Sequence, residues 1–395
     1  MNPIECIEKF VTDGEIAGAA LLVRQNDEIA FETVAGCTDI EMKTPVTGDT
    51  LFRLASMTKP IIGVAIMMLN EQGKLSLDDP VEKFIPTYKD MLVVDAPPNT
   101  NPFAAPEGDP LANMKLISAD KSITIGMLLS HSSGMTQGPV GSYLFEQIPC
   151  FESLEKRVNQ LAHIPLDFQP GTGTGYSAGS AFDTLGRIIE VASDNDLNMY
   201  MINHLFAPLG IKDIAFLPDE TQSARISKVY DYTNEKKLCE ADYKGMLFKV
   251  DARNHGYFSG SGGMFGSLNS SDRFVRMLAR GGELDGVRIL KEETVKLMAT
   301  SYGSRQPMPG MDWGLSVAVF EGIGKFRWLG KGSFGWSGAL GTHFYVDPEN
   351  KISVTLMLNR NNLQGALSHI SLAIEQAVYK SLVNANADVA KMPWL

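Results

Sequence analysis

Two short runs of β-branched and apolar residues lie near the start of the chain, at Ala19–Val23 and Ile29–Val34. The polar residues Gln25–Glu28 separate them, so the pattern predicts a β-hairpin. A helical pattern of apolar positions then runs from Met57 to Gln72 and ends at Gly73. Glycine often follows a helix because it adopts the left-handed conformation without strain. The N-terminal region is therefore expected to pair a hairpin with a helix.

From this helix to about residue 240 the chain shows mostly helical pattern interrupted by long loops. The stretch from Asp95 to Pro110 holds five prolines and predicts one such loop, either a surface excursion or the rim of a site. Three strand patterns and then a helical pattern occupy the last third of the chain; they are Gly314–Phe320, Thr342–Val346, Ile352–Leu358 and Gly365–Val383. A polar turn at residues 347–350 joins the last two strands.

Strands at both ends of the chain, with helices between them, predict one sheet that both ends build. Short turns between neighbouring strands make that sheet antiparallel. The predicted fold class is α/β plus all-α. Residues 1–80 and 240–395 form a discontinuous α/β domain in which helices flank the sheet, and residues 81–239 form a helical insertion. A chain of 395 residues is long enough for both parts.

Composition and charge exclude several classes of protein. Hydrophobic residues make up 44% of the chain and charged residues 21%, as in ordinary globular proteins. There are 35 basic and 46 acidic residues, a net charge of -11, without a basic cluster, so nucleic acid is not an expected partner. The four cysteines lie far apart with no histidine at ligand spacing, so we expect neither a metal nor a cofactor; they are Cys6, Cys37, Cys150 and Cys239.

The N-terminal stretch predicts a cytoplasmic protein. Residues Met1–Ala17 include four acidic side chains and lack the basic start and apolar middle of a secretory signal. The most apolar stretch, Ile61–Leu69, has nine residues, whereas a membrane span needs about 20. We therefore expect a soluble protein with no membrane partner.

A Ser-x-x-Lys motif occurs three times, at Ser56–Lys59, Ser118–Lys121 and Ser153–Lys156. One short motif carries little weight by itself, so the context has to separate the copies. The second copy lies in a polar connection and the third in a charged amphipathic stretch. Both of these are typical of solvated surface.

Ser56 has a different context, because it opens the predicted helix directly after an apolar run. Pro60 is tolerated only in the first helical turn, which keeps the helix from starting much earlier. The N-terminus of a helix favours a nucleophilic oxygen and a developing oxyanion. Lys59 lies one turn further on the same face. This copy is the candidate for chemistry.

A competing motif, Gly-x-Ser-x-Gly, spans Gly175–Gly179 and contains Ser177. In α/β-hydrolases such a serine must follow a buried strand. The preceding residues 170–174 have the composition of a loop, and no His-Gly-Gly-Gly segment lies upstream. Ser177 is therefore not favoured as a nucleophile.

Four segments in order carry a resemblance to a known family: Leu54–Pro60, Leu128–Gly134, Pro170–Ser177 and Gly335–Gly338. Together they resemble the serine β-lactamase and penicillin-binding superfamily, and more closely its class C-like esterase branch, the family VIII carboxylesterases. The similarity extends over nearly the whole chain. It implies a β-lactamase/transpeptidase-like fold with the active site between the α/β domain and the helical domain.

The resemblance implies that Ser56 is the nucleophile and that Lys59 and Tyr176 activate it. This assignment is chemically reasonable, because a serine hydroxyl needs an adjacent base. Lysine and tyrosine ordinarily titrate near 10, too high for a base at neutral pH. A cationic Lys59 would favour a tyrosinate at Tyr176, or a desolvated Lys59 would lose its own proton. Either group is then able to accept the Ser56 proton, and the sequence leaves both open.

The resemblance also implies the residues that contact the substrate. Trp336, Ser337 and Gly338 stand where β-lactamases carry Lys-Thr-Gly, and we expect them to bind substrate. The backbone N–H groups of Ser56 and Ala339 are expected to form the oxyanion hole. No cofactor or metal is implied.

Two departures from the β-lactamase pattern bear on the substrate. Ala178 replaces an asparagine that can bond an amide, and Trp336 replaces a lysine that helps to bind a carboxylate. An indole supplies apolar surface and one donor, which suits an uncharged ester. We therefore expect a serine carboxylesterase that hydrolyses small to medium esters through an acyl-enzyme on Ser56. The alternatives are a β-lactamase or D-amino-acid peptidase, an acyltransferase, and a non-catalytic binding or scaffold protein.

Three other polar residues are interpreted as structural. His131 is expected to hold a loop through hydrogen bonds. His343 lies five residues beyond Gly338, on the same strand pattern and within reach of the cleft, and we interpret it as structural. Asp272 is expected to cap a helix that begins near Arg273.

Overall fold

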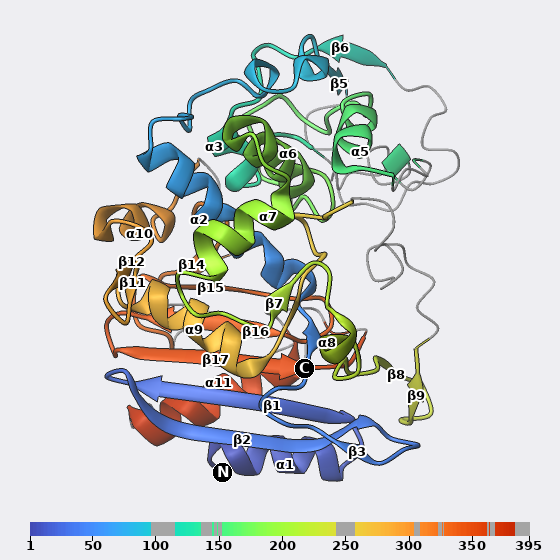
Figure 1. Cartoon of the computed structure of the whole chain (residues 1–395), viewed down its shortest axis with the longest axis vertical. Helices are drawn as coiled ribbons and strands as arrows, with labels where there is room; N and C mark the ends of the chain where they lie inside the picture. The colour runs from blue at the N-terminus through green and yellow to red at the C-terminus, as the bar shows by residue number, and fades with distance from the viewer. Residues whose placement is uncertain are drawn as a thin grey trace.

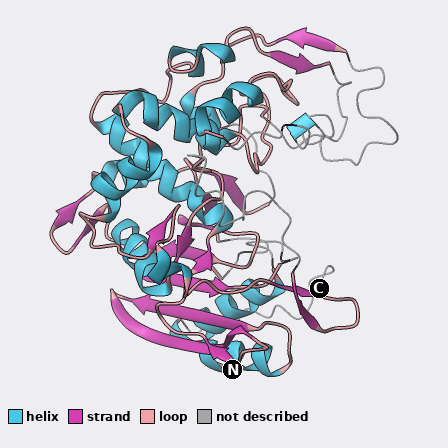
Figure 2. Cartoon of the chain, turned by 45° about the vertical axis from the view of Figure 1, so that its right-hand side comes forward, coloured by secondary structure: helices cyan, strands magenta, loops and turns pink. Residues whose placement is uncertain are grey.

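The computed structural model describes residues 1–95, 115–135, 144–145, 148, 152–241, 257–303, 309–322, 326, 328–361, 363 and 368–383. In Figure 1 a large sheet lies across the lower part of the molecule, and a group of helices lies above it. Figure 2 shows the same separation by secondary structure, with most strands below and most helices above. The boundaries expected at residues 80 and 240 stay a prediction.

The large sheet has eight strands in the order β13-β14-β15-β16-β17-β1-β2-β3. All neighbours in it are antiparallel. The N-terminal hairpin, β1 (Gly18–Gln25) and β2 (Glu28–Asp39), joins the C-terminal strands because β1 pairs with β17 (Ile352–Leu358). The prediction that both ends of the chain build one antiparallel sheet is therefore confirmed.

The turn between β1 and β2 explains why this hairpin forms. Asn26 and Asp27 adopt φ values of 54° and 68°, in the left-handed region. Both central residues of a type I′ turn need such values, and asparagine and aspartate tolerate them. The turn therefore matches the twist of the two strands that it connects.

One strand prediction was wrong. The run Gly314–Phe320 is not a single strand, because the chain reverses inside it between β13 (Met311–Trp313) and β14 (Ala318–Phe320). The N–H of Gly314 donates to the carbonyl of Val317, and Ser316 has φ of 70°. Turns are usually recognised in a sequence by a cluster of polar residues. This turn is buried and its residues are mostly apolar, so the sequence pattern does not reveal it.

Helices cover both faces of the sheet (Figure 1). α9 (Leu268–Ala279) packs on one face against β17 and β16 (His343–Asp347). α1 (Pro3–Thr12) and α11 (His369–Leu382) lie together on the other face. The helix expected from Gly365 corresponds to α11, although residues 364–367 lie outside the described part of the chain.

α2 (Thr58–Glu71) runs between the sheet and the upper helices, where every residue from Thr58 to Leu69 is buried. A helix that is apolar on all sides belongs inside a protein. The predicted helix from Met57 to Gln72 is thus confirmed. Within the residues that the structure describes, no helix has both the length and the apolar character needed to cross a membrane.

The upper part contains α3 (Ile125–Leu129), α5 (Leu154–Leu161), α6 (Ala181–Ser193) and α7 (Leu197–Met201), which continues into the π-helical η4 (Ile202–Phe206). The proline-rich loop predicted from Asp95 lies outside the described residues from position 96 onward.

The remaining elements are short. They are β3 (Thr44–Pro45), β4 (Phe52–Arg53), β5 (Leu92–Val94), β6 (Leu116–Ser118), β7 (Ile214–Ala215), β8 (Tyr230–Tyr232), β9 (Leu238–Glu240), β10 (Phe265–Gly266), β11 (Glu283–Leu284), β12 (Val287–Arg288), β15 (Ser333–Ser337), α8 (Glu220–Ser223), α10 (Glu292–Met298) and the 3-10 turns η1 (Ala55–Met57), η2 (Val81–Lys83) and η3 (Pro86–Tyr88).

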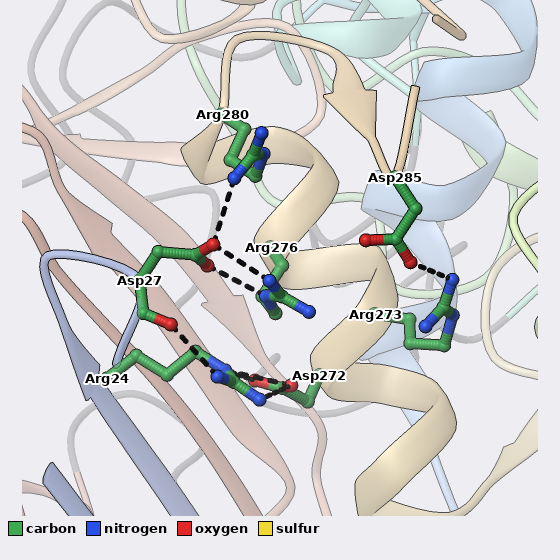
Figure 3. A network of polar contacts seen from close by, with 7 residues as sticks. All are labelled: Arg24, Asp27, Asp272, Arg273, Arg276, Arg280 and Asp285. Atoms are coloured by element: carbon green, nitrogen blue, oxygen red, sulfur yellow. Dashed lines mark hydrogen bonds and ion pairs between the residues drawn. The ribbon is translucent and has the colours of Figure 1, made fainter. Parts of the chain in front are cut away.

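Asp272 does not cap a helix, contrary to the sequence-based expectation. α9 begins at Leu268, and Ser267 caps it by accepting a hydrogen bond from the N–H of Ser270. Asp272 lies inside α9, where Arg24 of β1 binds it through Nε at 3.0 and 3.1 Å and through Nη2 at 2.9 Å (Figure 3). The helix starts five residues earlier than expected because serine is also a good cap.

A second set of contacts ties the same hairpin to α9. The carboxylate of Asp27, in the β1–β2 turn, accepts two bonds of 2.8 Å from Arg276 and one of 2.9 Å from Arg280 (Figure 3). Because Arg24 and Asp27 lie at the end of the hairpin, these ion pairs hold its tip against α9.

Asp272→Ala is expected to lower the free energy of unfolding by about 3 kcal/mol, because it removes the carboxylate bound to the largely buried Arg24 guanidinium and leaves it only the carbonyl of Asp27. Urea denaturation measures this loss. Asp285→Asn is the matched control, since it breaks the much more exposed Arg273–Asp285 pair and keeps a residue that tolerates φ of 52°. That variant should lose less than about 1 kcal/mol. Equal losses in the two variants would contradict the role given to Asp272.

Candidate active site

Ser56 lies in η1, the 3-10 turn that leads directly into α2. The preceding residue, Ala55, has φ of 46°, which is strained for a residue with a side chain. Leu54 is held on both sides: its N–H donates to the carbonyl of Met264 at 2.9 Å, and its carbonyl accepts from Oγ1 of Thr342 at 2.9 Å. Neighbouring backbone therefore determines where Ser56 is presented.

The end of β15 packs directly against this turn. A Cβ atom added at Gly338 would lie 2.3 Å from the carbonyl oxygen of Leu54. Glycine is therefore the residue that this close backbone approach allows. The approach brings the strand that carries Trp336 next to Ser56.

Lys59 is completely buried one turn after Ser56. Its Nζ donates to Oγ of Ser56 at 3.2 Å, to the carbonyl of Ala178 at 2.9 Å and to the carbonyl of Ser261 at 2.7 Å. Three acceptors match the three N–H groups of an ammonium ion. The lysine is therefore fixed beside the serine by two carbonyl groups from distant segments.

Tyr176 lies against the same lysine. The Lys59 Nζ sits 5.1 Å from the centre of the Tyr176 ring, and the Tyr176 hydroxyl accepts a bond of 3.3 Å from Nε1 of Trp336. Trp313 stacks on Tyr176 with ring centres 5.8 Å apart and meets Trp336 edge to face at 4.7 Å. We call Tyr176, Trp313, Trp336 and His131 the aromatic cluster. Its rings bring together four separate segments of the chain.

His131 holds the loop that carries Tyr176, as expected. Its Nδ1 accepts from the N–H of Ser177 at 3.1 Å, and its carbonyl accepts from the N–H of Gly175 at 2.9 Å. Burial, and then the positive charge of Lys59, hold the pKa of His131 well below its usual value of 6.5. The imidazole is therefore neutral, as an acceptor at Nδ1 requires.

Ser177 is completely buried, and its hydroxyl accepts a bond from the N–H of Ala181 at 3.0 Å, at the start of α6. The Gly-x-Ser-x-Gly segment therefore stabilises a helix end instead of presenting a nucleophile. The serines of the other two Ser-x-x-Lys copies lie at the surface or cap a helix. Ser118 is exposed on β6, and Ser153 caps α5 by accepting from the N–H of Lys156.

Trp336 and Ser337 occupy opposite faces of β15. Trp336 points to Tyr176, whereas Oγ of Ser337 lies 2.6 Å from Nδ1 of His343 and is almost fully buried. Nε2 of His343 lies 2.8 Å from Oε1 of Glu375 on α11. The structure thus joins Ser337 to a buried polar chain and does not bring its hydroxyl to the aromatic cluster. A substrate contact of Ser337 stays a prediction, and His343 is structural in this arrangement.

Ala339 is exposed in the tight turn that follows β15. The turn is closed by a bond of 2.7 Å from the N–H of Gly338 to the carbonyl of Thr342 and one of 3.0 Å from Gly341 to Gly338. The oxyanion role of the Ser56 and Ala339 N–H groups stays a prediction.

Sequence reasoning missed three parts of this site: Trp313, the carbonyl of Ser261, and Asp183. Asp183 lies on α6 and binds the segment that contains Ser261. Trp313 precedes the run expected to be a strand, and its aromatic character was the available signal. A backbone carbonyl cannot be identified as a ligand from the sequence, because every residue has one.

Within the described ranges, no group of three His, Cys, Asp or Glu side chains is arranged to hold a metal ion.

Comparisons with known proteins agree with this geometry. The beta-lactamase family model matches residues 4–378. Protein Rv1367c of Mycobacterium tuberculosis is 30% identical over 361 residues, which cover 87% of this chain and 85% of that protein. Esterase EstB of Burkholderia gladioli is 27% identical over 394 residues, covering 94% and 93% of the two chains.

The solved structure of EstCE1, described as a hydrolase with promiscuous acyltransferase activity, has a TM-score of 0.77 and 25% identity. The match covers 95% of this chain and 97% of that one. The family match spans almost the whole chain, and the eight-stranded antiparallel sheet with flanking helices has the family's architecture. The chain therefore belongs to the beta-lactamase family and is a serine hydrolase.

Proposed function

We propose that this protein is a carboxylesterase that hydrolyses uncharged esters of small to medium size through an acyl-enzyme on Ser56. The observation that carries the proposal is the contact of 3.2 Å between Nζ of Lys59 and Oγ of Ser56, beside the Tyr176 ring. The name of the relative EstB, an esterase 27% identical to this chain, supports it.

In the proposed reaction, Oγ of Ser56 attacks the ester carbonyl carbon, and its proton passes to the pair formed by Lys59 and Tyr176. The oxyanion is held by the N–H groups of Ser56 and Ala339, where one lost donor typically costs about 2.7 to 4 kcal/mol. The bond to the alcohol oxygen then breaks, and the alcohol leaves with the proton. Water then attacks the acyl carbon and gives up a proton to the same pair. The bond between the acyl carbon and Oγ of Ser56 breaks, the proton returns to Oγ, and the carboxylic acid leaves.

Trp336 supports the choice of an uncharged substrate. Its single N–H is already donated to the Tyr176 hydroxyl, so the side chain presents apolar surface and no positive charge. Ala178 is exposed next to Tyr176 and offers no amide group. A substrate carboxylate would therefore find neither the cation nor the amide available in β-lactamases.

Acyl transfer is the second candidate, because the similar structure of EstCE1 is that of a hydrolase with promiscuous acyltransferase activity. For this protein the acceptor would be an alcohol or an amine. The half-buried rings of Tyr176 and Trp336, packed on the buried Trp313, offer water few polar groups beside the nucleophile. Product analysis with an added alcohol separates the two activities. A free acid as the main product supports the esterase, and a new ester supports the transferase.

Ser56→Ala is expected to abolish turnover of p-nitrophenyl butyrate, by at least about 10⁴-fold, because it removes the attacking oxygen. It should also abolish labelling by a fluorophosphonate probe. Ser177→Ala is the matched control: it removes the hydroxyl that binds the N–H of Ala181 and should cost about 1 kcal/mol of stability while turnover persists. An active Ser56→Ala protein, or two equally inactive variants, would rule out the mechanism.

Trp336→Lys is expected to favour substrates that carry a carboxylate. The ratio of kcat/KM for a chromogenic cephalosporin to that for p-nitrophenyl butyrate should rise roughly fivefold, as for a solvent-accessible ion pair of about 1 kcal/mol. Trp336→Phe, which keeps an apolar ring and adds no charge, is the control and should leave this ratio near that of the parent. The selectivity argument fails if both variants change the ratio alike, or if the parent prefers the cephalosporin.

A further inference from the structure

A buried carboxylate binds the segment that supplies one of the carbonyl ligands of Lys59. Asp183 of α6 is completely buried, and both of its oxygens accept hydrogen bonds. Oδ1 accepts from Oγ of Ser259 at 2.8 Å and from the N–H of Ser261 at 3.0 Å, and Oδ2 accepts from the hydroxyl of Tyr257 at 2.5 Å. An ionised carboxylate is an acceptor only, which is what three donors require.

These three donors belong to one short segment, residues 257–261, and the same segment binds Lys59. The N–H of Ser261 points to Asp183, while the carbonyl of Ser261 accepts the shortest of the Lys59 bonds, at 2.7 Å. The segment lies tightly against α6, because a Cβ atom added at Gly260 would be 2.3 Å from the carbonyl oxygen of Phe182. Ser261 therefore connects the carboxylate of Asp183 to the ammonium group of Lys59.

Other charged and titratable groups face this arrangement from several elements. Burial, and then the negative charge of Asp183, raise the pKa of Tyr257 well above its usual range, so Tyr257 stays a neutral donor. Burial also raises the pKa of Tyr88, which bonds the next residue of α6, Thr184. Arg157 of α5 is a second cation, and its positive charge acts to lower the pKa of both tyrosines. His131 faces Lys59, whose charge lowers the pKa of the imidazole.

We infer that Asp183 is a positioning residue for the Ser56–Lys59 pair: it fixes the Ser261 carbonyl that holds Lys59 and places a negative charge one residue behind the ammonium group. The inference rests on the proposed function, because it assumes that Lys59 takes part in activating Ser56. Asparagine at this position is not equivalent. Its amide has one acceptor oxygen and an NH₂ group, which would oppose the donors of the 257–261 segment.

Asp183→Asn tests the inference through rate and pH dependence. The kcat for p-nitrophenyl butyrate should fall roughly 10- to 100-fold, with KM changed much less, because a displaced Lys59 impairs the chemical step. The ascending limb of kcat/KM against pH should move to lower pH by about half a unit or more. Removing a nearby negative charge favours proton loss from Lys59 and from Tyr176 alike, so the direction holds for either base.

Tyr88→Phe is the matched control. It removes a buried hydrogen bond of 2.8 Å to Thr184, the neighbour of Asp183 on α6, without touching the path to Ser261. Its pH limb should coincide with that of the parent. A folded Asp183→Asn protein whose pH limb also coincides with that of the parent overturns the inference, because a purely structural role lowers the rate without moving the limb.

Thermal unfolding shows whether Asp183→Asn is folded. If it is not, Ser259→Ala serves instead, because it removes one of the three donors and keeps the charge. That variant should label with a fluorophosphonate roughly 3- to 10-fold more slowly than the parent, because losing one of the three hydrogen bonds to the carboxylate loosens the segment only in part. A parent-like labelling rate overturns the inference.

Labelling also separates this inference from the proposed function. Phosphonylation of Ser56 reports on activation of the hydroxyl and needs no ester substrate. If the parent protein labels at Ser56 but hydrolyses no ester, the esterase proposal fails, and the labelling rates of the Asp183 and Ser259 variants still decide the role of Asp183.

Discussion

The interaction on which the site depends is the burial of the Lys59 ammonium group. A buried cation without partners is very costly, so its three hydrogen-bond acceptors have to be in place together. Two of them are carbonyl groups, of Ala178 from the loop before α6 and of Ser261 from the segment before β10. The requirement to satisfy one lysine therefore holds three separate segments around Ser56.

The surrounding structure supplies what this arrangement needs. α2 is buried from Thr58 to Leu69 and so holds Lys59 on a rigid element, directly after the 3-10 turn that carries Ser56. The strand β15 reaches the Ser56 turn because Gly338 allows close contact with Leu54. Neutral His131 holds the loop of Tyr176. Its ring contacts Phe182 of α6 on one side and Trp313 of β13 on the other, which links α6 to the sheet. These contacts come from different parts of the chain, so the site forms only when the whole fold is in place.

Charged groups make two kinds of contact in this molecule. The contacts of Arg24 and Asp27 attach the tip of the N-terminal hairpin to α9 and act on stability. The carboxylate of Asp183 instead binds neutral donors, and we infer that it acts on Lys59 through the backbone of Ser261. In the proposed mechanism the first kind keeps the sheet and its helix together, while the second keeps the base and the nucleophile aligned.

The sequence by itself determined the elements that depend on local pattern: the β1–β2 hairpin with its polar turn, the apolar helix α2, the strand β17, and the place of Ser56 directly ahead of α2. Turn chemistry and periodicity act over a few residues, so they can be recognised without a fold. The reversal at Gly314–Val317 and the start of α9 at Leu268 were missed, because a buried turn and an alternative cap give no distinct local signal.

Only the tertiary structure decided the partners of the key side chains. Lys59 binds carbonyl groups 119 and 202 residues away, and Asp272 binds Arg24 across 248 residues. Every residue has a backbone carbonyl, so no residue type marks Ser261 as a ligand of Lys59. The sheet order, which joins both ends of the chain, brings these groups together, and a buried charge finds its partner only after that packing has formed.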